Sequence, residues 1–167
     1  MLNIVLLEPE IPLNTGNIGR TCAAAGTRLH LIHPLGFVLN DKLIRRAGMD
    51  YWDSLDVTEY ADYEDFLQRN PGAKVYMATT KAKKCYTEAS YEPDCFLMFG
   101  KESAGIPEEL LVGNEENCVR IPMLGDTRSL NLANSAAILL YEALRQNGFP
   151  GLEKEGDLHR LSWGSGR

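Results

Sequence analysis

The chain has 167 residues, of which 44% are hydrophobic and 24% charged, and its formal net charge at pH 7 is −6. This length is close to that of one domain of ~150 residues, and the composition excludes intrinsic disorder. The longest apolar run, residues 136–141, is far shorter than the ~20 residues that a membrane-spanning helix needs. The negative charge argues against a protein that coats nucleic acid through bulk electrostatic attraction.

The start of the chain and its cysteines indicate a cytoplasmic protein. The run MLNIVLLEPE lacks a basic start and reaches Glu8 too early for a secretory signal. The four cysteines contain no C-x-x-C pair, so we expect reduced thiols and no zinc site. His30 and His33 are three residues apart on an expected strand and would point to opposite faces, so they cannot chelate one ion together. With His159 in the tail, we expect no metal site.

Short apolar runs alternate with helical patterns along the chain. This predicts an α/β fold with a largely parallel sheet and helices on both faces. We expect strands over residues 2–7, 28–33, 74–79, 94–99 and 118–121. We expect helices over residues 14–25, 62–70 and 131–146, and a short one that starts at Pro107.

The first and last predicted helices indicate how the domain is organised. The first carries small side chains and ends at Gly26, a typical helix stop. The last has an apolar stripe at helical spacing, which marks core or interface. We expect residues 1–150 to form a single domain and residues 151–167, rich in polar residues and glycine, to form a flexible tail.

Two glycine-containing segments fall short of nucleotide-binding motifs. Gly16-Asn-Ile-Gly19 lacks the third glycine of the dinucleotide fingerprint. The segment from Gly100 to Gly105 has the glycine spacing of a P-loop, but Ile106 and Pro107 stand where Lys and Ser or Thr must hold phosphate and magnesium. ATP hydrolysis therefore has no support in the sequence.

Polar, glycine-containing segments follow three of the predicted strands, over residues 14–20, 99–107 and 121–134. In open α/β sheets, ligands bind at the ends of strands, where loops offer donors and acceptors without disturbing the core. Taken singly, the first segment is as consistent with a helix capped by Asn14 that carries an incidental Arg20 as it is with a functional site. The second segment is as consistent with an ordinary loop as it is with a functional site. The third has more polar groups than one helix cap needs, and these are Arg128, Ser129, Asn131 and Asn134.

Positive charge gathers in residues 42–46 and in residues 81–84. Solvated loops and helix ends explain such clusters most simply, and a local RNA contact is the alternative.

In their order and spacing, the polar segments resemble the three motifs of the SPOUT-class RNA 2'-O-ribose methyltransferases. The matching runs are N-T-G-N-I-G-R, F-G-K-E-S-A-G-I-P and I-P-M followed by R-S-L-N-L-A-N-S. The segment from Arg45 to Trp52 is similar to the branch that acts on the tRNA wobble nucleotide. The resemblance covers nearly all of residues 1–150, and that branch consists of the catalytic domain alone, which agrees with a chain of this length.

The resemblance implies a deep trefoil knot in the C-terminal part of the fold, with S-adenosylmethionine bound in the knot and no metal. Sequence physics alone would argue against a knot, because knots are rare. The implied reaction is methyl transfer to the ribose 2'-hydroxyl of nucleotide 34, a cytidine or a 5-carboxymethylaminomethyluridine. The implied partners are a tRNA anticodon loop and a second copy of the chain in a homodimer, with no membrane and no DNA.

The resemblance also implies roles for individual residues. The catalytic set is Arg20, Asn14, Ser129 and Asn131. Arg20 would clamp the substrate phosphate and stabilise the oxyanion, and its guanidinium stays protonated, so we expect the hydroxyl proton to go to phosphate or water. The residues expected around the adenosine of the cofactor are Ala78, Thr79, Gly100, Ile121, Ser129 and Leu130. The residues expected to contact RNA are Arg45, Arg46, Arg128 and Tyr141, the last of which could equally pack in an interface.

Two other functions stay open at this point. One is a non-catalytic RNA-binding module of the same fold, and the intact set of Arg20, Ser129 and Asn131 argues against it. The other is a 2'-O-methyltransferase that acts on another tRNA ribose or on rRNA. Residues 45–52 and the lack of an added RNA-binding domain favour the wobble nucleotide.

Overall fold

The computed structural model describes residues 1–39 and 52–164. The strands are β1 (Asn3–Leu7), β2 (Arg28–Ile32), β3 (Val57–Tyr60), β4 (Val75–Ala78), β5 (Lys84–Cys85), β6 (Phe96–Phe99) and β7 (Cys118–Arg120). The helices are α1 (Pro12–Ala25), α3 (Tyr63–Arg69), α4 (Glu108–Val112) and α5 (Leu132–Gln146), with 3-10 turns η1 (Trp52–Ser54), η2 (Tyr86–Glu88) and η3 (Glu115–Asn117).

Within these residues the strands form one sheet, in the order β3-β2-β1-β6-β4-β7-β5. Each neighbouring pair is parallel. The carboxyl ends of the strands therefore share one edge of the sheet, where the sequence predicts ligand-binding loops.

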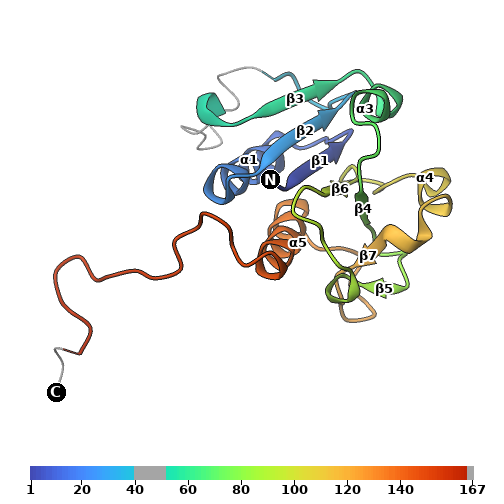
Figure 1. Cartoon of the computed structure of the whole chain (residues 1–167). Coiled ribbons are helices and arrows are strands. Elements are labelled where there is room, and N and C mark those ends of the chain that lie inside the picture. The colour runs from blue at the N-terminus through green and yellow to red at the C-terminus, as the bar shows by residue number, and fades with distance from the viewer. Residues whose placement is uncertain (40–51, 165–167) are drawn as a thin grey trace.

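Helices cover both faces of the sheet, as the sequence predicts (Figure 1). All of β1 is buried, and its side chains alternate between two cores. Ile4 and Leu6 pack with α1 and α5, whereas Val5 and Leu7 pack with α3 and α4. Burial on both faces explains why the central strands appear in the sequence as continuous apolar runs.

The helix ends follow local chemistry. The side chain of Asp62 caps α3 by accepting a hydrogen bond from the backbone N–H of Asp65 at 2.8 Å. α4 begins after Pro107 and has Glu108 and Glu109 in its first turn, where acids favour the helix dipole. Gly26 ends α1 with a φ of 59°, a left-handed conformation that glycine adopts without strain.

The structure corrects the expected elements in two places. β3 and β5 are edge strands that we did not predict, because their sequences, VTEY and KC, are short and largely polar. β2 ends at Ile32, so His33 lies beyond the strand, and only His30 is part of it. Among the described residues, no cluster of histidine, cysteine and acidic side chains is arranged to hold a metal ion.

The chain leaves the body of the domain after α5. Phe149 and Leu152 still pack against the core beneath α1 and α5, and beyond them the chain runs outward (Figure 1). The flexibility of this tail stays a prediction. In the part of the chain that the structure describes, no helix combines the length and apolar character needed to cross a bilayer.

Candidate functional site

A cavity of about 580 Å³ lies at the carboxyl ends of β4, β6 and β7. Ligand pockets for small molecules usually have ~300–1,000 Å³ and combine apolar walls with a few polar groups. This cavity has both kinds of wall, since Phe99, Ile106 and Val119 lie beside hydroxyl and charged side chains. It is large enough for a nucleoside-sized ligand.

The three polar segments come together at this cavity. The six residues expected around the cofactor all line it, and these are Ala78, Thr79, Gly100, Ile121, Ser129 and Leu130. Asn14, Asn131 and Arg128 line it as well. Their clustering follows the prediction, while their individual roles stay predictions.

The segment after β6 forms a tight wall loop, residues 100–106, along one side of the cavity. The backbone N–H of Gly105 donates to the carbonyl of Lys101 at 2.8 Å, and Gly105 has a φ of 72°. A Cβ on Gly100 would overlap the carbonyl carbon of Gly105 and the amide nitrogen of Ile106. Gly100 is therefore needed for the loop to close on itself, in addition to any approach of a ligand.

Asn14 does not cap α1, so one of the two interpretations of the first segment, a helix capped by Asn14, is wrong. The helix begins two residues earlier, at Pro12, whose fixed φ suits the first turn, and its N-cap is Ile11. The buried Asn14 side chain instead makes two long-range contacts. Its Nδ2 donates to Oε1 of Glu102 at 3.0 Å, and its Oδ1 accepts from Nδ2 of Asn131 at 3.0 Å.

Asn131 caps α5, and this cap fixes which atoms donate and which accept in the hydrogen bonds that link Asn131, Asn14 and Glu102. Its Oδ1 accepts from the backbone N–H groups of Ala133 at 2.9 Å and Asn134 at 3.3 Å, so its Nδ2 is left to donate to Asn14. At the other end, the carboxylate of Glu102 accepts all of its hydrogen bonds. Both amide groups are therefore held in one orientation by their partners.

Glu102 is a site residue that the sequence reasoning missed. Its carboxylate also accepts from the backbone N–H groups of Glu10 at 2.8 Å and Ile11 at 3.2 Å. It thus joins the wall loop to the loop that enters α1. The only sequence signal was an acid inside a glycine-bounded loop, and its partners lie about 90 residues away.

Some of the residues that we expected to contact RNA or to take part in catalysis do not line the cavity. Arg20 is exposed on α1 and Tyr141 is 45% exposed on α5, and these two helices pack against each other. Neither side chain belongs to the set of described residues that line the cavity. Arg45 and Arg46 lie outside the described residues, as does most of the segment from Arg45 to Trp52.

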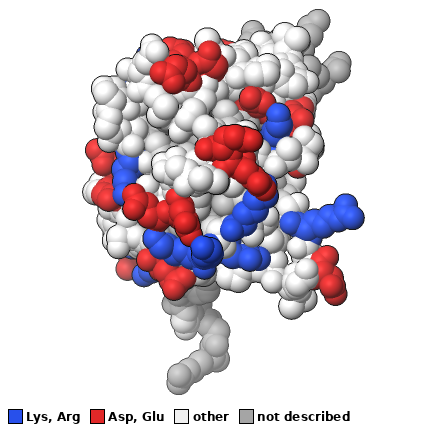
Figure 2. All heavy atoms as spheres, turned by 90° about the vertical axis from the view of Figure 1, so that its right-hand side faces the viewer, with Lys and Arg blue, Asp and Glu red and all other residues white. Residues whose placement is uncertain are grey.

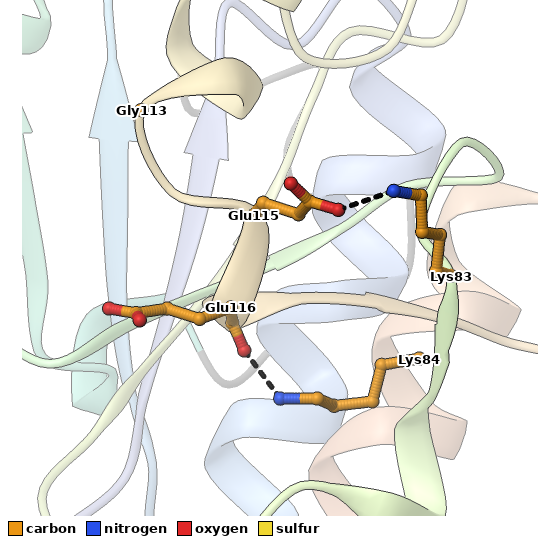
Figure 3. Close-up of a pocket in the computed structure, with 5 residues that line it drawn as sticks. All are labelled: Lys83, Lys84, Gly113, Glu115 and Glu116. Carbon is orange, nitrogen blue, oxygen red and sulfur yellow. Dashed lines mark hydrogen bonds and ion pairs between the residues drawn. The ribbon is translucent and has the colours of Figure 1, made fainter.

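Each of the three lysines in the basic cluster at residues 81–84 has a partner, which is an acidic side chain for two of them and a backbone carbonyl for the third. Nζ of Lys81 lies 2.9 Å from Glu108, and Nζ of Lys83 lies 2.7 Å from Glu115. Nζ of Lys84 donates to the backbone carbonyl of Glu116 at 2.6 Å, beside a hollow of about 520 Å³ (Figure 3). These contacts support the reading of a solvated surface cluster.

Both acidic and basic side chains lie on the face that carries α4, and its Lys and Arg side chains gather in a band across the lower half of the view, bordered by acidic side chains (Figure 2). Any nucleic-acid contact on this face would therefore be local.

The sequence profile of the SpoU rRNA Methylase family matches residues 1–141, which include the three polar segments. The chain belongs to this family. A Listeria innocua relative is 50% identical over 161 residues, which make up 95% of this chain and 95% of the relative. The Escherichia coli protein named tRNA (cytidine(34)-2'-O)-methyltransferase is 48% identical over 152 residues, 90% of this chain and 97% of that protein.

Solved structures of SpoU methylases share this fold. A structure that addresses the 2-OH methylation of C/U34 on tRNA has a TM-score of 0.84 at 44% identity, over 89% of this chain and 97% of that one. The SpoU methyltransferase AviRb from Streptomyces viridochromogenes, in complex with AdoMet, has a TM-score of 0.76 at 25% identity, over 88% of this chain and 58% of AviRb. The seven-stranded parallel sheet with flanking helices is therefore the SpoU methylase fold.

Proposed function

We propose that this protein transfers a methyl group from S-adenosylmethionine to the ribose 2'-hydroxyl of tRNA nucleotide 34, a cytidine or a modified uridine. The observation that carries the proposal is the convergence of the second and third motif segments on one cavity, together with Asn14 of the first. The name of the Escherichia coli relative and the structure concerned with C/U34 support this nucleotide over another ribose.

The residues of the cavity fit S-adenosylmethionine. Apolar walls from Phe99, Ile106 and Val119 suit an adenine ring, and the hydroxyls of Thr79 and Ser129 can bond to polar groups of the ligand. The AviRb complex supports the same cofactor. When bound, S-adenosylmethionine supplies a methyl group on a positively charged sulfur, so the reaction needs no metal.

The residues of this chain bind and orient the reacting groups. The linked amides of Asn14 and Asn131 form a preorganised polar edge of the cavity, and Ser129 lies beside them in the lining. Arg20 on α1 provides a fixed fork of donors for a substrate phosphate and for negative charge that develops on the 2'-oxygen. The proton of the hydroxyl passes to phosphate or water, because the guanidinium is already protonated.

The protein works as a homodimer on the anticodon loop, and its C-terminal part forms a deep trefoil knot. The motif resemblance supports the knot. Support for the dimer comes from exposed apolar side chains on the two packed helices, with Leu13 of α1 at 56% exposure and Ile138 of α5 at 37%. Apolar surface of this kind is typical of protein interfaces.

Two tRNA substrates that differ only at nucleotide 34 test the proposal. One carries cytidine and the other 2'-deoxycytidine, and single-turnover transfer of labelled methyl from S-adenosylmethionine is measured for both. We expect transfer to the first and none to the second, since the second lacks the accepting oxygen. Equal transfer to both would place the reaction on another ribose. Cofactor binding without transfer to any RNA would favour the non-catalytic module.

A further inference from the structure

Two glutamates hold the wall loop against the loop that follows β1. The carboxylate of Glu102, in the wall loop, accepts from the backbone of Glu10 and Ile11. The carboxylate of Glu10 makes the reverse contact, since Oε2 accepts from the backbone N–H of Ser103 and Oε1 from its hydroxyl, both at 2.8 Å. Each glutamate thus binds the loop of the other, and we call these contacts of Glu10, Glu102, Ile11 and Ser103 the reciprocal clasp.

The backbone of Glu10 is fixed from its other side. The N–H of Gly36 donates to the carbonyl of Pro9 at 2.9 Å, and a Cβ on Gly36 would lie 2.7 Å from the Cα of Glu10. Glu10 therefore reaches from a firmly packed loop to the wall loop. Hydrogen bonds from the backbone and the hydroxyl of Ser103 lower the pKa of Glu10, so its carboxylate is charged near neutral pH.

Both hydrogen bonds of this contact depend on acceptor atoms of the Glu10 side chain. Both donors of Ser103 meet the two oxygens of Glu10, and a carboxylate has two acceptors and no donor. A glutamine at this position could keep both contacts, because the Ser103 hydroxyl can accept from an NH₂ group as well as donate. An alanine would remove both acceptors, and with them both hydrogen bonds of the contact.

The clasp lies between two parts of the site. Ser103, Ala104 and Gly105 line the cavity, whereas the loop of Glu10 leads into α1, which carries Asn14 and Arg20. We propose that Glu10 is a positioning residue that holds the cavity wall in a fixed place relative to α1, and so aligns the cofactor with the RNA ribose. This inference rests on the proposed function. Small displacements of reacting groups lower rates strongly, by roughly 100-fold per ångström in sensitive cases.

Glu10→Ala tests the proposal, with Glu8→Ala as the matched control. Glu8 also contacts the wall loop, through Nζ of Lys101 at 2.7 Å, but by a side-chain ion pair that is one-third exposed. Exposed ion pairs of this kind contribute little. For each variant we would measure backbone hydrogen exchange over residues 100–106, the affinity for S-adenosylmethionine, the melting temperature, and the single-turnover rate at saturating cofactor.

In Glu10→Ala we expect faster exchange in the wall loop and a single-turnover rate roughly tenfold lower at saturating cofactor, with a melting temperature close to that of the wild type. In Glu8→Ala we expect exchange and rate close to the wild type. Ser103→Ala removes the hydroxyl donor of the contact and should also lose part of the rate.

Wild-type exchange and rate in Glu10→Ala would overturn the proposal, as would an equal loss in Glu8→Ala. A wild-type protein that binds the cofactor but methylates no tRNA would reject the proposed function instead. The exchange of residues 100–106 would then still decide whether Glu10 holds the wall loop.

Discussion

At the scale of single residues, the site depends on which atoms donate and which accept. Asn14 and Asn131 lie 117 positions apart in the sequence, and their amides are oriented by the carboxylate of Glu102 at one end and the start of α5 at the other. Because each amide has only one suitable orientation, a change of a single donor to an acceptor should disturb the whole chain of contacts.

Asn14→Asp makes this change without altering the size of the side chain. It places a second carboxylate about 3 Å from Glu102, and we expect a loss of stability of about 1–3 kcal/mol at pH 7. The loss should shrink as the pH falls, because one protonated carboxyl restores the missing donor. Urea denaturation at pH 7 and pH 5 measures this, with Asn17→Asp on the exposed side of α1 as the control. Equal stability of both variants at pH 7 would contradict the account.

His30 is a second residue whose burial should make the stability of the protein depend on pH. Asn3 uses its Nδ2 to donate to backbone carbonyls, so its Oδ1 accepts from Nε2 of His30 at 3.1 Å, and Nδ1 of His30 accepts from the hydroxyl of Tyr60 at 2.9 Å. The imidazole is thus held neutral, and desolvation lowers its pKa to about 4 from 6.5.

The unfolded chain takes up a proton on His30 below pH 6.5, whereas the folded chain does so only near pH 4. The free energy of unfolding should therefore decrease as the pH is lowered across this window. From this residue alone we expect a decrease of roughly 2 kcal/mol between pH 7 and pH 5. Denaturation of wild type and His30→Gln at both pH values isolates the effect, because acidic groups contribute to both proteins. A stability difference between the two proteins that is the same at pH 5 and pH 7 would count against it.

At the scale of elements, burial decides what could be predicted from the sequence. The central strands β1, β2, β4, β6 and β7 were predicted within a few residues, because burial on both faces requires continuous apolar runs. The edge strands β3 and β5 lack that requirement and were missed. The start of α1 was predicted two residues late, because the Asn14 side chain serves a partner distant in sequence instead of the helix end.

The same reasoning applies to the site. The three polar segments could be placed together because parallel strands bring their carboxyl ends to one edge. The reciprocal clasp could not be predicted, since Glu10 and Glu102 carry no local pattern that pairs them across 92 positions.

The wall loop gives a prediction for one element. Gly100→Ala should cost about 1–3 kcal/mol of stability and weaken binding of S-adenosylmethionine, because the new Cβ overlaps the backbone at Gly105 and forces the loop open. Gly113→Ala is the control, since its φ is −75° and a Cβ there meets nothing within 4 Å. Thermal denaturation and calorimetry measure both effects. A Gly100→Ala protein that binds the cofactor as the wild type does would refute the role of the loop.

At the scale of the whole molecule, the exposed apolar side chains of α1 and α5 are the feature to explain. If these helices form the dimer interface, sedimentation at micromolar concentration should give about twice the chain mass of 18.6 kDa. Ile138→Asp should shift the protein toward the monomer, because it places a charge in an apolar interface. The control is Val112→Asp, which changes an 82% exposed residue on α4. A wild-type protein that sediments as a single chain would rule out this assembly.

The most direct test of the central claim is a map of ribose methylation in the RNA of cells that lack this protein. We expect the 2'-O-methyl group to be missing at nucleotide 34 of one or more tRNAs and restored when the wild-type gene is returned. Methylation elsewhere in tRNA and in rRNA should be unchanged. Intact methylation at nucleotide 34 together with a loss at an rRNA position would contradict the account.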